Sequence, residues 1–142
     1  MRSELSLSVQ YASSEASIPA RHRFRRWVSS ALDAPAQITI RIVDLDEGRS
    51  LNREFRGKDY ATNVLTFVYE SGVGDIVICA PVIAREAMEQ KKPLESHYAH
   101  MTVHGVLHLQ GYDHEEENDA QIMEAREQAI MARFGYADPY RV

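Results

Sequence analysis

Residues 37–43 read Gln-Ile-Thr-Ile-Arg-Ile-Val, an alternation of polar and β-branched side chains that predicts a strand with one buried face. The run 5–9 alternates in the same way on the N-terminal side. On the C-terminal side, residues 63–69 and 73–80 are rich in β-branched and aromatic side chains, and the glycines between them mark a turn. These four segments predict one sheet of about four strands.

Helical spacing of apolar residues, together with residues that typically begin or end helices, predicts the remaining elements. The predicted helices follow Pro19, run from Asp44 or Asp46 to about Phe55, and cover residues 81–92, 94–110 and 118–135. For the last helix, Asn118 and Gln121 have the spacing of a capping box. Strands early and helices late indicate an α+β (mixed α/β) fold, in which the sheet is packed with helices.

The length and composition favour a single small domain over residues 1–142, without repeats or linkers. The chain has 16 Lys and Arg against 21 Asp and Glu, for a formal charge of −5, which argues against coating nucleic acid by bulk electrostatics. No apolar run approaches the ~20 residues of a membrane helix, and the N-terminus lacks the apolar core of a signal peptide. One cysteine, Cys79, suits a reducing cytoplasm.

Histidines are concentrated in one stretch of the chain. His97, His100, His104 and His108 would occupy one arc of roughly 80° on the predicted helix, and His114 follows shortly after it. Any one isolated histidine is more simply explained as a polar residue with satisfied hydrogen bonds. Four imidazoles on one helical stripe favour a functional site instead.

Within this stretch, His104, His108, Gly111 and His114 have the spacing H-x-x-x-H-x-x-G-x-x-H. Histidines at i and i+4 can point at one metal ion, and a glycine that adopts positive φ can turn the chain so that a third histidine returns to it. Three neutral imidazoles suit one Zn²⁺ ion and leave a fourth position open for water. The spacing therefore predicts a catalytic zinc site at the end of a central helix.

The same spacing occurs in metzincin proteases, where a glutamate follows the first histidine and acts as the general base. Here that position is Gly105, so a zinc metalloprotease is the less favoured hydrolase. A second alternative is a non-enzymatic assembly factor whose zinc only holds the fold. That alternative needs a fourth protein ligand, for which Asp113 and Cys79 are the candidates. Asp113 has two further interpretations, as a residue that orients an imidazole or as a turn residue.

A phosphate-stabilising group is also needed if the substrate is a phosphodiester. Arg56 is the candidate, because arginine carries a permanent charge on a rigid fork that matches phosphate oxygens. From the residues alone, a solvated arginine at a helix end is the simpler interpretation of Arg56.

The run 104–114, His-Gly-Val-Leu-His-Leu-Gln-Gly-Tyr-Asp-His, closely resembles the hallmark of the YbeY family of bacterial metal-dependent endoribonucleases. Further similar stretches are residues 52–59, 62–67, 74–76 and 135–140, with Asn63 where many relatives have Asp. The resemblance implies zinc on His104, His108 and His114, with Arg56 as the catalytic arginine. It further implies a cytoplasmic endoribonuclease that prefers single-stranded RNA and acts in 16S rRNA 3′-end maturation and ribosome quality control.

The resulting hypothesis is that zinc activates water or polarises a phosphodiester oxygen while Arg56 stabilises the negative charge of the transition state. The expected partners are 16S rRNA, the ribosome or its small subunit, and ribosomal or assembly proteins, with no membrane and no DNA. The net charge of −5 then predicts weak binding to free RNA, with selectivity supplied by the ribosome or a partner protein.

Overall fold

The computed structural model describes residues 4–141 and contains one four-stranded sheet with the spatial order β1-β2-β4-β3. The strands are β1 (Leu5–Ala12), β2 (Ala36–Val43), β3 (Val64–Glu70) and β4 (Val73–Cys79). β1, β2 and β4 run parallel, whereas β3 pairs antiparallel with β4 through a short turn. β3 is therefore an edge strand with one free side.

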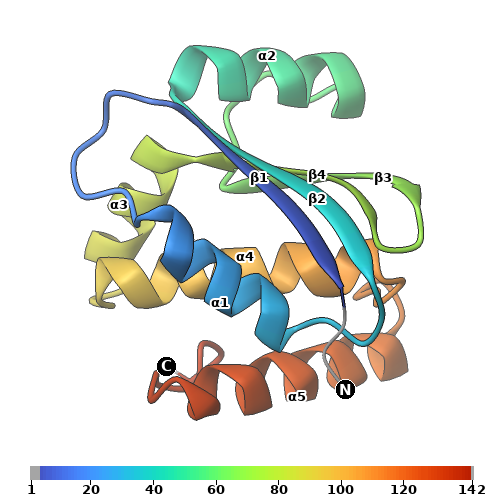
Figure 1. Ribbon diagram of the computed structural model, residues 1–142. Helices are drawn as coiled ribbons and strands as arrows, with labels where there is room; N and C mark the ends of the chain where they lie inside the picture. The colour runs from blue at the N-terminus through green and yellow to red at the C-terminus, as the bar shows by residue number, and fades with distance from the viewer. Residues whose placement is uncertain (1–3, 142) are drawn as a thin grey trace.

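Helices cover both faces of this sheet (Figure 1). The helices are α1 (Arg21–Ser30), α2 (Leu45–Arg56), α3 (Ala80–Glu89), α4 (Leu94–Leu109) and α5 (Glu117–Arg133). α2 lies alone on one face, α1 and α4 lie on the other, and α5 packs on the far side of α4. The predicted α+β architecture with a four-stranded sheet is confirmed.

The alternation read from residues 37–43 explains how the sheet divides the core. Ile38, Ile40 and Ile42 are buried in the large cluster shared with α1, α4 and α5. In β4, Val77 and Cys79 belong instead to a smaller cluster on the α2 face. Because successive side chains of a strand point to opposite faces, β2, β3 and β4 contribute to both clusters, whereas β1 contributes to the large one. Full burial of one isoleucine contributes roughly 2–3 kcal/mol.

The central helix α4 approaches the sheet unusually closely. A Cβ atom added to Gly105 would lie 3.0–3.2 Å from three carbon atoms of Ile76 in β4. Near the end of the helix, the Leu109 side chain packs over Gly74, where an added Cβ would lie 2.6 Å from it. Glycine at these two positions therefore sets the height of α4 above the sheet, and with it the position of the histidines on α4.

Two details of the helix starts differ from expectation. The capping box predicted at Asn118 is wrong, since α5 begins at Glu117 and no side chain caps it. Asp44 does precede α2, but its carboxylate accepts hydrogen bonds from Ser13 and Ser14 instead of capping the helix. No helix formed by residues 4–141 combines the length and apolarity that crossing a bilayer requires.

Candidate active site

The four histidines of α4 fall into two pairs with different surroundings. His97 and His100 are only 3% and 7% exposed, whereas His104 and His108 are partly open to solvent. The His97 Nε2 atom lies 2.8 Å from a carboxylate oxygen of Glu86. Burial lowers the pKa of His97 despite this contact, so the imidazole is neutral at pH 7. His97 and His100 line one cavity, beneath the C-terminal segment, whereas His104 and His108 line a second cavity.

That cavity has a volume of about 510 Å³ and lies between α4, β3 and the end of α2. His104, His108, His114 and Arg56 all line it. Gly111 adopts φ 100° just after α4 and turns the chain back, so that the ring centroid of His114 lies 5.4 Å from that of His104 and 6.3 Å from that of His108. The fold thus brings the four residues singled out in the sequence to one place.

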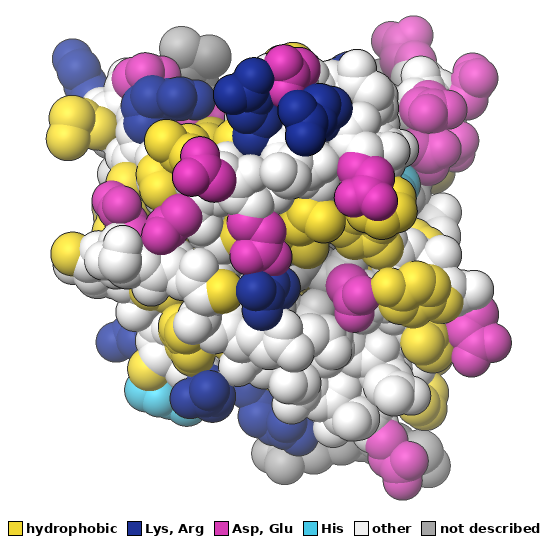
Figure 2. All heavy atoms as spheres, turned by 90° about the horizontal axis from the view of Figure 1, so that it is seen from above, with side chains coloured by type: hydrophobic (Ala, Val, Ile, Leu, Met, Phe, Trp, Pro, Cys, Tyr) yellow, Lys and Arg dark blue, Asp and Glu magenta, His cyan; other side chains and the backbone are white. Residues whose placement is uncertain are grey.

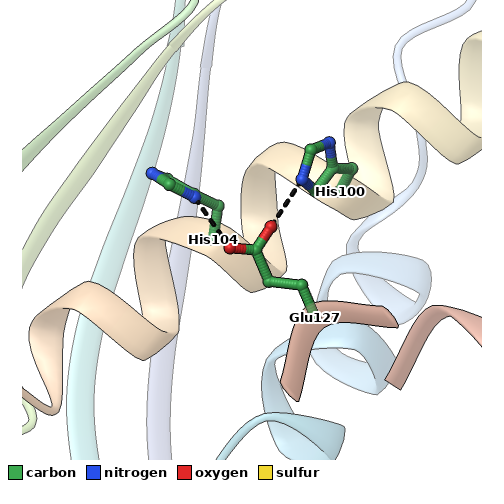
Figure 3. A group of neighbouring side chains, drawn as sticks. All are labelled: His100, His104 and Glu127. Atoms are coloured by element: carbon green, nitrogen blue, oxygen red, sulfur yellow. Dashed lines mark hydrogen bonds and ion pairs between the residues drawn. The ribbon is translucent and has the colours of Figure 1, made fainter. Parts of the chain in front are cut away.

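A buried carboxylate stands directly behind this group. Glu127 of α5 has no exposed surface, and its oxygens contact His100 Nε2 at 2.5 Å and His104 Nδ1 at 3.1 Å (Figure 3). One of these oxygens also contacts the Tyr140 hydroxyl at 2.6 Å. Burial raises the pKa of Glu127, but the hydrogen bonds from His100, His104 and Tyr140 outweigh burial and hold the pKa at about 2. Glu127 is therefore ionised at neutral pH.

These contacts determine which ring nitrogen of two histidines carries the proton. An ionised carboxylate only accepts hydrogen bonds, so His104 donates from Nδ1 to Glu127. The Nδ1 atom of His108 lies 3.1 Å from the carbonyl oxygen of Tyr112, which is also only an acceptor. When either ring is neutral, its Nε2 atom therefore keeps the lone pair, and no described residue hydrogen-bonds to either Nε2 atom.

Among residues 4–141, His100, His104 and Glu127 are a group whose ligand atoms lie within 4.8 Å of one another, so this group could hold a metal ion. Their facing atoms are already engaged in hydrogen bonds of 2.5–3.1 Å with one another. By contrast, His104, His108 and His114 all line an open cavity, and the first two imidazoles use Nδ1 for hydrogen bonds that leave the Nε2 lone pairs available.

Arg56 occupies the last turn of α2, which ends at Gly57 with φ 71°. Its neighbour Arg49 is committed to a two-pronged ion pair with Asp59, with distances of 2.8 and 2.9 Å. Within the described part of the chain, no carboxylate forms an ion pair with Arg56. Its guanidinium is therefore an unneutralised positive charge at the edge of the cavity.

The two candidates for a fourth protein ligand differ in position. Cys79 is buried in the cluster on the α2 face of the sheet, whereas α4 lies on the opposite face. Asp113 lines the cavity, but its carboxylate accepts hydrogen bonds from the backbone N–H groups of His114 and Glu115. Asp113 is thus a turn residue, and it forms no hydrogen bond with an imidazole within residues 4–141.

Glu127 and Tyr140 were not singled out in the sequence. For Glu127, however, a signal existed in the sequence. The buried residues of α5 are Met123, Glu127, Ile130 and Met131, which have the spacing of one helix face. A lone carboxylate on an apolar stripe requires a buried partner, and this rule would have identified Glu127.

Comparisons with known proteins agree with the motif. A sequence model of the family described as Endoribonuclease YbeY matches residues 8–135. A protein named Endoribonuclease YbeY from Nitrosomonas europaea is 59% identical over 140 residues, covering 96% of this chain and 85% of its own length. Its namesake from Thiobacillus denitrificans is 58% identical over 145 residues and covers 99% of both chains.

Among solved structures, the solution structure of TM1509 from Thermotoga maritima has a TM-score of 0.60 at 23% identity. The match covers 96% of this chain and 99% of that chain. This similarity supports the fold.

Proposed function

The chain belongs to the YbeY family of endoribonucleases. From that premise we propose that it is a metal-dependent hydrolase that cleaves single-stranded RNA at internal phosphodiester bonds. The observation that carries the proposal is one cavity that combines three histidines with an unneutralised arginine. The proposed biological substrate is 16S rRNA, at its 3′-end maturation and in ribosome quality control, which places the protein in the cytoplasm.

One zinc ion would be held by His104, His108 and His114. The support is the hydrogen bonding of the first two rings, which leaves the Nε2 lone pairs available. Imidazole is a good ligand for Zn²⁺, and three protein ligands leave a position for the reaction. When bound, zinc supplies Lewis-acid polarisation of a phosphodiester oxygen and lowers the pKa of a water molecule.

Arg56 would bind the scissile phosphate. Phosphodiester cleavage adds negative charge to the phosphoryl oxygens in the transition state, and a guanidinium can donate two parallel hydrogen bonds to them. Because no acidic side chain neutralises Arg56 in the described residues, its charge remains available to the substrate. Its position at a glycine-terminated helix end keeps the guanidinium at the cavity rim.

Exposed aromatic rings at the same cavity support a preference for unpaired RNA. Phe55 is 59% exposed and its ring rests edge-on against Phe67, with 5.1 Å between centroids. Tyr69 is 68% exposed, and its hydroxyl donates a hydrogen bond of 2.6 Å to Asp75. Aromatic rings held in this way can stack on unpaired bases.

The surface charge supports weak binding to free RNA. On the α2 side, Lys and Arg side chains stand in small groups beside acidic ones, with hydrophobic side chains exposed between them (Figure 2). Such a mixed surface offers positive potential only locally. Selectivity would then come from the ribosome, its small subunit, or an assembly protein that presents the RNA.

The decisive experiment compares the zinc-loaded wild-type protein with Arg56→Ala on labelled RNA. We expect cleavage of single-stranded RNA, little cleavage of the same sequence in a duplex or as DNA, and a loss of about 10²–10³-fold in kcat for Arg56→Ala. Zinc content should be equal in both proteins. Lys58→Ala is the matched control, because Lys58 is a nearby exposed cation that does not line the cavity. Full activity of Arg56→Ala would remove Arg56 from the mechanism.

A zinc metalloprotease is the second candidate, favoured by one observation. β3 lines the cavity as an edge strand, and an edge strand can bind an extended peptide by adding a strand to the sheet. Against it, position 105 faces Ile76 of the sheet, where a carboxylate would have no access to the cavity. An unstructured peptide incubated beside the RNA separates the two functions, since peptide cleavage with intact RNA would favour the protease.

A further inference from the structure

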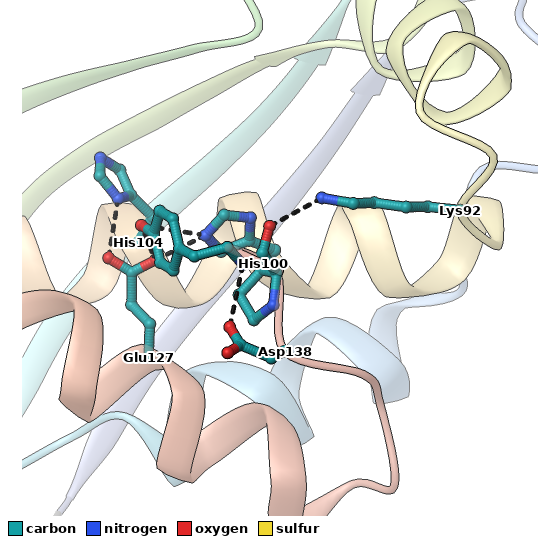
Figure 4. Close-up of polar contacts among 7 residues, drawn as sticks. Lys92, His100, His104, Glu127 and Asp138 are labelled. Carbon is teal, nitrogen blue, oxygen red and sulfur yellow. Dashed lines mark hydrogen bonds and ion pairs between the residues drawn. The ribbon is translucent and has the colours of Figure 1, made fainter. Parts of the chain in front are cut away.

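The C-terminal segment 136–141 contacts the interior of the protein behind the candidate metal site. Tyr140 donates its hydroxyl hydrogen bond to Glu127, and its ring meets that of His100 edge-on, with 5.3 Å between centroids (Figure 4). One contact ties the segment to the connection between α3 and α4, and another stabilises its own turn. Lys92 donates to the carbonyl oxygen of Pro139 at 2.9 Å, and Asp138 accepts from the backbone N–H of Tyr140 at 2.9 Å.

Glu127 connects this segment to the cavity. Its Oε2 atom accepts from Tyr140 and His100, whereas its Oε1 atom accepts from Nδ1 of His104. A carboxylate with no exposed surface loses its hydration, and that cost is offset only when hydrogen bonds satisfy both oxygens. The three donors together meet this requirement. They also fix the plane of the carboxylate, and this orients the Oε1 atom that accepts the hydrogen bond from His104 Nδ1.

We propose that Glu127 and Tyr140 are positioning residues of the metal site: Tyr140 and His100 orient the Glu127 carboxylate, which holds His104 as the Nδ1–H tautomer with Nε2 turned to the metal. The inference rests on the proposed function for the role of His104 as a ligand. In metal sites generally, a carboxylate behind a ligating imidazole fixes the tautomer and the ring orientation. Here a residue in the last turn of the chain extends that arrangement by one further hydrogen bond.

The segment follows the residues that the family model matches. The family match ends at residue 135, whereas Tyr140 lies five residues beyond it. Gly135 adopts φ 79° at the end of α5 and reverses the chain so that the segment returns toward α4. Within residues 4–141, the segment thus reaches the metal site through the Tyr140 hydrogen bond to Glu127 and the contact of Tyr140 with His100.

The test measures zinc affinity by competition with a chelator, without RNA, in the full-length protein. Tyr140→Phe keeps the ring on His100 and removes only the hydroxyl, and we expect several-fold weaker zinc binding. Glu127→Gln retains one acceptor oxygen for His104, and Glu127→Ala retains none, so we expect losses of about tenfold and up to about 100-fold. Tyr136→Phe is the matched control, because the Tyr136 hydroxyl forms no hydrogen bond within residues 4–141.

A second readout needs no metal. Nitrogen NMR of the metal-free protein reports the tautomer of each imidazole directly. We expect His104 as Nδ1–H in the wild type and in Tyr136→Phe, and a mixture of both tautomers in Glu127→Ala. Urea unfolding of the metal-free variants identifies any protein that has lost its fold. Tyr140→Phe then carries the test, since Tyr140 is 39% exposed and lies outside the core.

Three results would overturn the proposal. The first is equal zinc affinity for Tyr140→Phe and Tyr136→Phe together with an unchanged affinity for Glu127→Gln. The second is the Nε2–H tautomer of His104 in the wild type. The third is zinc binding that persists in His108→Ala but vanishes in Glu127→Gln, which would make Glu127 a ligand. None of these results depends on RNA cleavage, so a failure of the proposed function would be recognised separately, by intact RNA at full zinc loading.

Discussion

Substitution of Gly105 by alanine tests the close approach of α4 to the sheet. The added Cβ would lie 3.0 Å from Cδ1, 3.1 Å from Cγ2 and 3.2 Å from Cγ1 of Ile76, whereas carbon atoms pack best at about 3.5–4.0 Å. Ile76 is completely buried, so its side chain has little room to move away. Such overpacking costs about 1–3 kcal/mol.

Alanine also has a favourable effect, because it is about 1 kcal/mol better than glycine inside a helix. The two effects leave a net destabilisation of about 1 kcal/mol for Gly105→Ala, measured as the free energy of unfolding in urea. Since His104 adjoins the substituted residue and His108 lies one turn further along α4, zinc affinity should fall as well.

A double-mutant cycle isolates the contact. Ile76→Val removes the Cδ1 atom that would lie nearest to the new Cβ, and by itself costs about 0.5–1.5 kcal/mol. The double variant should be more stable than the sum of the single changes predicts, by about 0.5 kcal/mol or more. Stabilisation by Gly105→Ala, or strict additivity in the cycle, would refute the reasoning that α4 touches β4 at this point.

Three further predictions follow from other contacts. In steady-state assays, Phe55→Ala should raise KM for single-stranded RNA about tenfold with little change in kcat, because one stacking surface is lost. Tyr60→Ala should leave KM unchanged, because Tyr60 is similarly exposed but does not line the cavity. Burial lowers the pKa of His97 in the folded protein, so the unfolded chain binds more protons and folding stability falls as the pH drops below about 6.5. Urea unfolding at pH 7.5 and 5.5 should show a smaller loss for His97→Gln than for the wild type. Gly74→Ala should abolish stable β3–β4 pairing in hydrogen exchange, because its Cβ would lie 2.1 Å from the Phe67 carbonyl oxygen; native-like protection of β3 would contradict this.

Much of the architecture follows from local patterns. The alternation in residues 37–43 predicts a strand because it reflects a period of two, and the burial of Ile38, Ile40 and Ile42 confirms the face. Gly111 predicts the end of α4 because a positive φ excludes most side chains, and φ is 100° there. Such features depend on neighbouring residues only, so spacing is sufficient to predict them.

In the candidate site, too, local spacing predicts the positions of some residues and not of others. The spacing of His104 and His108 places both on one side of a helix whatever the rest of the fold, and the motif to which they belong also indicates the family. Residue spacing could not indicate that Arg56 lines the same cavity, because about 50 residues separate it from the motif, and only the family resemblance implied it. From the residues alone, a solvated helix end was the simpler interpretation.

The surroundings of the histidines were decided by the tertiary structure alone. Glu127 meets His104 only because α5 packs across α4, and Tyr140 meets Glu127 only because the chain turns back after Gly135. Cys79 is buried in the cluster on the α2 face and does not line the cavity, because the sheet order joins strands that are distant in sequence. Periodicity determines which side of an element a residue occupies, whereas the partner on that side depends on how all elements pack together. The sequence by itself therefore determined the elements, the histidine motif and the family, and the packed fold determined which ring nitrogen of His104 and His108 carries the proton.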